Sequence, residues 1–474
     1  MSRHKRTFGT VTARRKGLGA AFRGVLLACF VLDLLPVKTF ADEATLGEAS
    51  ASSSVRGLGG PFAKTLEAIV EAETLFPNLK RQLEKLSPFF RDTHATLNTR
   101  TYYFDREFRS LGKQSEAWAI GGSVDYETGW YRDWLSFGAG YYQSEKLLGE
   151  EDRGGTLLLA PGQEGIAVVG KAYAKLKCRD HQAVLYRQEL NVPYVNKQDS
   201  RMIPNTFEAY KLKGAVHDVP VAGTFHYILG YVDEVKQRNA DRFISMSEAA
   251  GVAGKDRGLV MAGAAVQPHD DLIFGAINHF VDDTLNIFYT EADYHCPLTE
   301  ELGLRFQGQF THQQSVGDDL LTDSDFETWV LGGRVAASYQ GLILKAAFST
   351  TDDEQKIRSP FGSYPGYISL MQKDFNRADE DAWLVGASYD FGRVGLEGLS
   401  FFTSYAEGRN ARDGDDGSAL SDQREFDITA DYRIREGVLK NLWLRARWST
   451  LDLAGEDRNT DDFRVIVNYE IPIL

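Results

Sequence analysis

Long apolar runs are almost absent from this 474-residue chain. One occurs near the N-terminus, from Val25 to Leu35, and it is about half the length of the roughly 20 apolar residues that a membrane-spanning helix needs. The mean hydropathy of the chain is −0.32. These features exclude a bundle of transmembrane helices. They do not exclude a transmembrane β-barrel, because only half of each barrel strand faces lipid.

Cysteine is nearly as scarce, with three residues in the whole chain. Two of them, Cys178 and Cys296, follow residue 41, and so few exclude a disulfide-stabilised scaffold. Cys178 falls on a strand face that we expect to meet lipid, so we predict two free thiols.

Catalytic and metal-binding motifs are missing as well. Neither His-Glu-x-x-His nor Gly-x-Ser-x-Gly occurs. His295-Cys296 is an isolated pair, whereas a metal site needs three or four ligands. The acidic stretch from Asp413 to Gly417 lacks the ligand spacing of an EF-hand and is typical of a solvated loop tip. We predict that the protein is not an enzyme and has no cofactor and no metal site.

The N-terminus has the three regions of a secretory signal peptide. Seven basic residues and no acidic one lie in the first 24 positions, and the apolar run from Val25 follows them. A small-x-Ala site ends at Ala41. We therefore predict that residues 1–41 form a signal peptide. A lipoprotein cleavage site at Cys29 is the less favoured alternative, because the apolar run continues past it.

The mature chain is strongly acidic. The full sequence has 53 basic and 67 acidic residues, and residues 1–41 contain eight of the former and one of the latter. A formal net charge of −21 therefore remains after cleavage. So acidic a surface makes nucleic acid an improbable partner.

The clearest positive signal is a period of two residues, which is typical of β-strands. Between residues 171 and 179, Lys171, Tyr173, Lys175, Lys177 and Arg179 alternate with small or apolar side chains. A Lys or Arg turned to lipid near the bilayer midplane would cost about 2–4 kcal/mol. Four such charges make that placement untenable, so the basic face must line water.

The C-terminal third repeats this alternation in three segments, at 425–434, 442–449 and 463–471. In the second, Leu444, Ala446 and Trp448 oppose Arg445 and Arg447. Aromatic side chains gather near the expected strand ends, as they do in the girdles of membrane barrels. A water-soluble sandwich also alternates, so period two alone does not place the chain in a membrane.

We predict an all-β fold, a transmembrane antiparallel β-barrel of about 18 strands over residues 89–474. The expected strands begin near residues 94, 115, 131, 165, 182, 205, 220, 257, 270, 283, 300, 326, 341, 381, 398, 424, 440 and 461. Short connections such as 394–398 alternate with long acidic ones such as 410–422, which is the asymmetry of periplasmic turns and external loops. A barrel of this size leaves an aqueous channel.

Residues 42–88 differ from the rest. Apolar residues recur at helical spacing between 62 and 70 and again at Leu79, Leu83 and Leu86, and Pro77 separates the two groups. We interpret residues 42–88 as a periplasmic helical extension ahead of the barrel. A loosely ordered tail is an equal alternative, because short isolated helices are marginally stable.

Four stretches, in order, resemble the OprD family of outer-membrane porins. Leu97 to Arg106 is similar to the family's first strand, and Asp199 to Phe207 to the segment that closes its constricting third loop. Asp374 to Ala378 resembles the end of its seventh loop, and Asp462 to Leu474 its C-terminus. The resemblance runs from about residue 90 to 474. The extension at 42–88 is a departure from the family's usual pattern.

The resemblance implies an 18-stranded channel in the outer membrane of a Gram-negative bacterium, with loops folded inward to form a narrow eyelet. It also implies a ladder of basic residues that guides carboxylate-bearing solutes such as amino acids or organic acids. By position, Arg445, Arg447 and Arg464 fall on or near this ladder, Arg201 falls by the third loop, and Ser369 and Asp374 fall on the lining of the seventh. With Lys171, Lys175 and Lys177 from the alternating strand, these are the expected pore-lining residues.

Passive, selective diffusion of small solutes is thus the predicted function. An outer-membrane barrel enzyme and a plugged structural barrel are the alternatives. The expected partners are small-molecule solutes, outer-membrane lipid, lipopolysaccharide (which the acidic stretch near Asp413 could help to bridge through divalent cations) and, during biogenesis, the barrel-assembly machinery. Arg445 and Arg447 could instead pair with acids of the preceding strand, such as Asp427, Asp431 or Glu425.

Overall fold

The computed structural model describes residues 74–322, 324–437, 439–455 and 459–474. The expected signal peptide at 1–41 and the first apolar group at 62–70 lie outside these residues. Within them, β-strands predominate.

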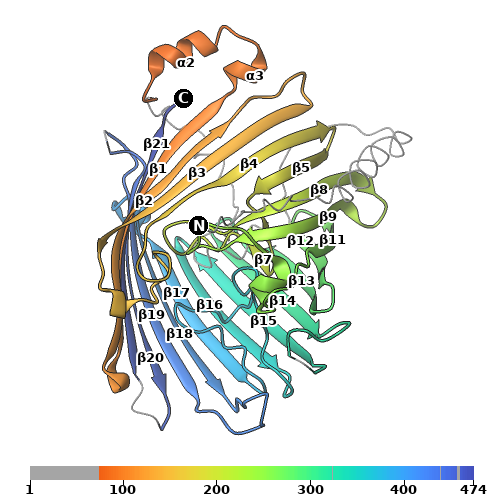
Figure 1. The fold of residues 1–474 in the computed structure, drawn as a ribbon, viewed down its shortest axis with the longest axis vertical. Helices are drawn as coiled ribbons and strands as arrows, with labels where there is room; N and C mark the ends of the chain where they lie inside the picture. The colour runs from red at the N-terminus through yellow and green to blue at the C-terminus, as the bar shows by residue number, and fades with distance from the viewer. Residues whose placement is uncertain (1–73, 323, 438, 456–458) are drawn as a thin grey trace, which may run out of the picture. The chain divides into compact units, whose positions relative to one another are not determined.

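In this described part of the chain, eighteen long antiparallel strands form a single sheet that closes on itself (Figure 1). The strands are β1 (His94–Phe108), β2 (Lys113–Glu127), β3 (Leu135–Leu148), β4 (Ile166–Cys178), β5 (His181–Gln188), β8 (Thr206–Val219), β9 (Gly223–Lys236), β11 (Leu259–His269), β12 (Leu272–Val281), β13 (Leu285–Pro297), β14 (Leu302–Gln314), β15 (Glu327–Tyr339), β16 (Leu342–Thr351), β17 (Asp381–Asp390), β18 (Leu399–Arg409), β19 (Gln423–Arg433), β20 (Leu442–Leu453) and β21 (Thr460–Pro472). Closure comes from β1, which pairs with both β2 and β21. The predicted barrel is confirmed, and each expected strand start lies within four residues of the observed one.

The remaining elements are short. The two-residue strand β10 (Ile244–Ser245) pairs with β9, and β6 (Asn191–Val192) and β7 (Val195–Asn196) form a separate hairpin. Short helices are α2 (Pro77–Leu83), α3 (Pro88–Arg91), α4 (Met246–Ala250), η2 (Arg109–Leu111), η3 (Glu151–Arg153) and η4 (Phe391–Val394). No helix in the described ranges is long and apolar enough to cross a membrane.

Side chains on the long strands are distributed in the reverse of a water-soluble protein. On β21, Phe463 is 43% exposed and Val465 36%, whereas Arg464 between them is 2% exposed. Large exposed apolar side chains recur on the outside of other strands, for example Trp118, Leu331 and Trp448. An outer wall this apolar is expected only where lipid covers it. The two-residue alternation therefore predicted correctly which face of each strand is turned outward. Cys178 is exposed, free and on the outer face, as predicted.

The two ends of the barrel differ in the length of their connections. One end, which we call the short-turn end, has turns such as 270–271 and 340–341 and also holds the C-terminal end of β21. The other, the long-loop end, has the second loop (149–165), the third (189–205), the fourth (237–258) and the seventh (352–380). This is the predicted asymmetry.

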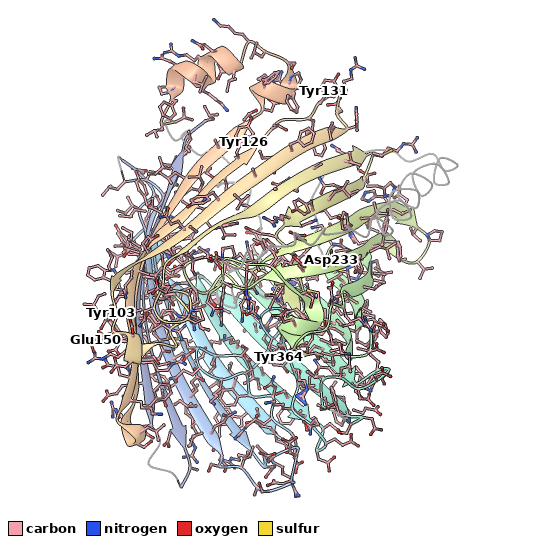
Figure 2. The ribbon with its side chains drawn as sticks, in the orientation of Figure 1. Tyr103, Tyr126, Tyr131, Glu150, Asp233 and Tyr364 are labelled. Atoms are coloured by element: carbon pink, nitrogen blue, oxygen red, sulfur yellow. The ribbon has the colours of Figure 1, made fainter. Side chains whose placement is uncertain are left out.

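The third and seventh loops fold into the barrel and pack on each other there. Tyr194 and Tyr364 are buried, with ring centroids 6.1 Å apart, and Figure 2 shows Tyr364 within the barrel. The hydroxyl of Ser363 donates a hydrogen bond of 2.9 Å to Oδ1 of Asn196. Both loops belong to an apolar cluster that covers the inner wall from β8 to β15. They therefore narrow the lumen from one side.

Helices α2 and α3 lie at the short-turn end, beside the C-terminal end of β21 (Figure 1). Pro77 starts α2, which suits its fixed φ and missing N–H. The N–H of Leu75 donates to the carbonyl of Pro472 over 2.8 Å, and the N–H of Gly129 donates to the carbonyl of Phe89 over 3.0 Å. Hydrogen bonds at both ends of the segment thus tie it to the barrel.

Candidate pore constriction

Two predicted basic residues face each other on the inner wall. Arg464 of β21 is opposite Arg447 of β20 in the strand register, and Phe104 of β1 is the other neighbour of Arg464. Paired residues of antiparallel strands point to the same face, so all three side chains project into the lumen. Like charges directly opposite destabilise a sheet. The arrangement therefore requires compensation from other groups.

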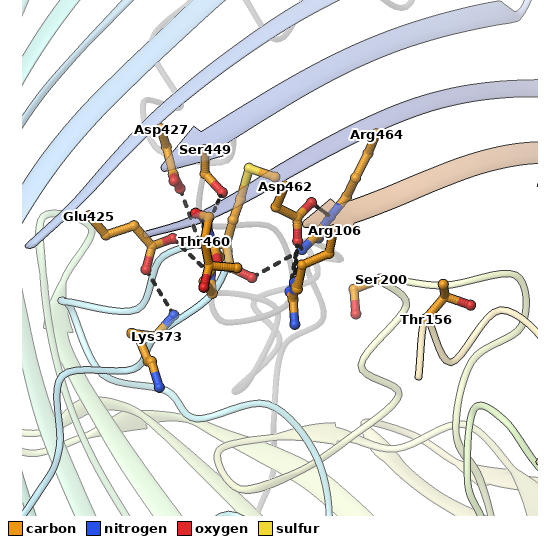
Figure 3. Close-up of polar contacts among 12 residues, drawn as sticks. Arg106, Thr156, Ser200, Lys373, Glu425, Asp427, Ser449, Thr460, Asp462 and Arg464 are labelled. Atoms are coloured by element: carbon orange, nitrogen blue, oxygen red, sulfur yellow. Dashed lines mark hydrogen bonds and ion pairs between the residues drawn. The ribbon is translucent and has the colours of Figure 1, made fainter. Parts of the chain in front are cut away.

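Arg464 obtains this compensation from Asp462. The guanidinium donates to the two Asp462 oxygens over 2.6 and 2.7 Å, and Arg106 of β1 donates to the same carboxylate over 2.7 Å (Figure 3). The Arg464 guanidinium carbon also lies 4.8 Å from the centre of the Phe104 ring, within cation–π range. Arg464 is thus fixed in place, but the single carboxylate that it shares with Arg106 leaves the three side chains with a net positive charge.

Arg447 has no such partner. Its Nε donates to the hydroxyl of Thr429 over 3.1 Å, and among the described residues no carboxylate oxygen lies within 4.0 Å of its guanidinium. The guanidinium therefore keeps donors and positive charge available toward the lumen.

Two further arginines come from the loops and meet at Ser200. Arg201 donates to the carbonyl oxygens of Thr156 and Ser200 over 2.7 and 2.8 Å, and Arg238 of the fourth loop donates to the Ser200 hydroxyl over 2.5 Å. Neither guanidinium forms an ion pair within the described ranges. We call Arg201, Arg238 and Arg447 the unpaired arginines.

Burial and the positive charge of Arg464 both disfavour the charged forms of Arg201 and Arg238. They lower the pKa of Arg201 well below its ordinary value and the pKa of Arg238 to about 10. Both shifts mean that the surroundings disfavour the cation. An anion that entered this space would relieve that electrostatic cost.

Arg445, two residues from Arg447 on the same face, is arranged differently. It donates to both oxygens of Asp431, each over 2.6 Å, and Asp431 lies directly opposite it on β19. The sequence left open whether Arg445 and Arg447 pair with acids of the preceding strand. Within the described residues, Arg445 forms such an ion pair and Arg447 does not.

Two buried carboxylates hold the seventh loop against the wall (Figure 3). Glu425 accepts from the backbone N–H groups of Gln372 and Lys373 over 2.7 and 2.9 Å. Asp427 accepts from the N–H of Met371 over 3.0 Å. We call Glu425 and Asp427 the loop tether.

Ser369 and Asp374, expected on the seventh loop, lie together there. The Ser369 hydroxyl donates to Asp374 over 2.6 Å, and burial raises the pKa of Asp374 despite this hydrogen bond. Asp374 borders a cavity of about 450 Å³, which is also lined by Lys356 and Arg358. The cavity gives a solute space beside the loop.

The three lysines of β4 also face inward but are not part of this cluster. Lys171 pairs with Asp125 and lies 3.5 Å from a carboxylate oxygen of Glu189. Lys175 is 2.6 Å from Glu127, and Lys177 lies 5.7 Å from the Trp130 ring centre. Two of the three charges are thus locally neutralised.

Two arginines of the constriction, Arg238 and Arg106, were not among the pore-lining residues expected from the sequence. Arg238 lies in a loop with no periodic pattern, and nothing in its surroundings marks it. Arg106 could have been found, because β1 continues the alternation that places its side chain inside.

An apolar outer wall, a polar lumen and inward loops with unpaired cations define a diffusion channel of the outer membrane. The model of the OprD family of outer membrane porins matches residues 87–473. Porin D of Pseudomonas aeruginosa is 23% identical over 419 residues, covering 81% of this chain and 92% of that protein. The Porin-like protein GalP of Pseudomonas putida is 23% identical over 400 residues, which cover 81% of this chain and 93% of that protein.

Solved structures agree on the fold. OccK9 (OpdG) of P. aeruginosa superposes with a TM-score of 0.73 at 24% identity, over 81% of this chain and all of that one. OpdK of P. aeruginosa, solved with vanillate, superposes with a TM-score of 0.71 at 20% identity, over 80% of this chain and 99% of that one. The chain belongs to the OprD family of outer membrane porins and is located in the outer membrane. Its short-turn end accordingly faces the periplasm.

Proposed function

We propose that this porin passes small solutes that bear a carboxylate, such as amino acids or organic acids. The observation that carries the proposal is the set of unpaired arginines, which gather around inward loops although the protein as a whole is acidic. OpdK of P. aeruginosa, which has the same fold, was solved with vanillate, a small carboxylate.

The magnitude favours local charge over the acidic exterior. A carboxylate about 5 Å from one guanidinium gains about 3 kcal/mol before desolvation at an effective dielectric constant of about 20. Acidic residues of the external loops act across water and are screened beyond about 8–10 Å. Asp374 of the seventh loop acts directly on Arg238, and it should weaken the attraction of the unpaired arginines for a carboxylate without reversing it.

The test is uptake into liposomes of a carboxylate and its neutral amide of equal size. The wild-type channel should favour the carboxylate several-fold. Arg447→Gln should lower that ratio about three- to tenfold, which corresponds to about 0.7–1.4 kcal/mol. The double variant Arg445→Gln with Asp431→Asn, which removes a complete ion pair from the same inner face, is the matched control and should leave the ratio unchanged. Equal uptake of both solutes by the wild type would refute the proposal.

The same preparation distinguishes the alternative functions. A plugged structural barrel would show no conductance in planar bilayers, whereas an open porin gives discrete steps. The roles of Lys171, Lys175, Lys177, Ser369, Asp374 and Arg464 as pore lining remain part of this proposal, as do contacts with lipopolysaccharide and with the barrel-assembly machinery.

A further inference from the structure

The segment from Thr74 to Asp92 has an unusual surface for this chain. Its exposed apolar side chains include Leu79, Leu86 and Phe90, which are 43%, 52% and 48% exposed. Four basic and two acidic residues give it a net positive charge in a strongly acidic protein. Half-exposed apolar groups beside basic side chains are typical of helices that lie in a membrane interface.

The position of the segment supplies the second observation. Phe89 of α3 contacts Tyr131, with ring centroids 6.2 Å apart and the rings nearly perpendicular. Tyr131, Tyr126 and Trp134 are exposed aromatic residues of the outer wall at the short-turn end, and Figure 2 shows Tyr131 beside α3. Aromatic residues at this level form the girdle that meets lipid headgroups. The apolar surface of α2 and α3 is therefore continuous with the lipid-facing wall.

We propose that α2 and α3 lie in the headgroup region of the periplasmic leaflet of the outer membrane. Leu79, Leu86 and Phe90 enter the boundary with the acyl chains. Lys80 and Lys85 extend toward lipid phosphates, as long basic side chains do at interfaces. The occupant of this surface is thus anionic phospholipid of that leaflet, and the segment is a second membrane contact in addition to the barrel.

The continuity with the girdle favours lipid over a protein partner. A helix pair that projected into the periplasm to bind a protein would not need to rest on Tyr131 or to be joined to the barrel through Phe89 and Gly129. The positive charge also complements anionic lipid headgroups.

The experiment measures the depth of spin labels in the mature protein, folded into vesicles of phosphatidylethanolamine and phosphatidylglycerol. Cys178→Ser and Cys296→Ser provide the background, and Leu86→Cys and Phe90→Cys carry the labels. Arg81→Cys is the matched control, because Arg81 follows Leu79 by two positions and so lies on the other side of α2. Heat-modifiable mobility on gels confirms folding, and Leu79→Cys replaces Leu86→Cys if that variant does not fold.

Labels at 86 and 90 should collide with oxygen more than with a water-soluble nickel chelate, with a ratio at least threefold above that at 81. Equal access of the chelate to all three labels would show that the segment stands in water and would overturn the proposal. Protection of labels 86 and 90 from both reagents would also overturn it, because a protein surface rather than lipid would then cover them.

Discussion

Replacing Glu425 with Gln should loosen the seventh loop without unfolding the barrel. Glu425 is fully buried, and its two oxygens each accept one backbone N–H of the loop, at Gln372 and Lys373. Glutamine has the same shape but a single acceptor oxygen. Its amide nitrogen would face a backbone N–H, so one of the two hydrogen bonds must be lost.

The size of the effect follows from this geometry. An ordinary hydrogen bond contributes about 0.5–1.5 kcal/mol, and a buried backbone N–H that loses its acceptor costs about 1–3 kcal/mol more. A loss of about 2–3 kcal/mol raises the ratio of detached to attached loop roughly 30- to 150-fold. The Gln372 side chain keeps hydrogen bonds to Ser449 and to the carbonyl of Thr460, so detachment should be local and reversible.

Single-channel recording in planar bilayers is the appropriate measurement. Glu425→Gln should show a noisier open current and more frequent transitions to a higher conductance than the wild type. Asp431→Asn is the matched control. Asp431 lies on the same strand and face, but its ion pair is with Arg445 and not with the loop. This control should lower the melting temperature and keep the wild-type current.

A quiet, wild-type current from Glu425→Gln together with a lower melting temperature would contradict this prediction. Glu425 would then stabilise the wall without governing the position of the loop. An unchanged melting temperature and unchanged current would show that the two hydrogen bonds contribute little.

Three other predictions follow from the constriction. Arg445→Ala should lower the free energy of unfolding by about 3 kcal/mol, because it breaks the buried ion pair with Asp431. A melting curve checks this, and an unchanged melting temperature would contradict it. Asp374→Asn should increase carboxylate uptake two- to threefold over the neutral amide, roughly 0.5 kcal/mol, because it removes a carboxylate that acts electrostatically on Arg238; lower uptake would contradict this. Because burial lowers the pKa of Arg238 to about 10 in the folded protein, its charge is present at pH 7 and is lost as the pH rises through about 10. Carboxylate preference should therefore fall over that range, and an identical fall in Arg238→Gln would assign the effect to other groups.

The barrel was predictable because lipid imposes a severe rule on each strand. A one-residue slip would have placed Arg445 and Arg447 in hydrocarbon, so alternation alone assigned their faces. The same rule correctly placed Phe463 and Val465 outside.

Which cation pairs with which acid was not predictable. That depends on register between strands: Asp431 is opposite Arg445, whereas Thr429 is opposite Arg447. Loop residues are harder to predict, because no alternating pattern shows which way their side chains point. Arg238 lies in such an irregular segment, the fourth loop. Arg201 was found only by resemblance to family members.

The seam between β1 and β21 has a consequence for assembly. Tyr102, Phe104 and Arg106 belong to the first strand and Arg464 to the last, so the surroundings of the unpaired arginines do not exist until these strands pair. A solute that binds there binds only the closed form. At a concentration one hundred times its dissociation constant, it would favour closure by about 2.7 kcal/mol. The transported molecule would thus act as a folding ligand for the channel that imports it, and barrels assembled in its presence should close in higher yield.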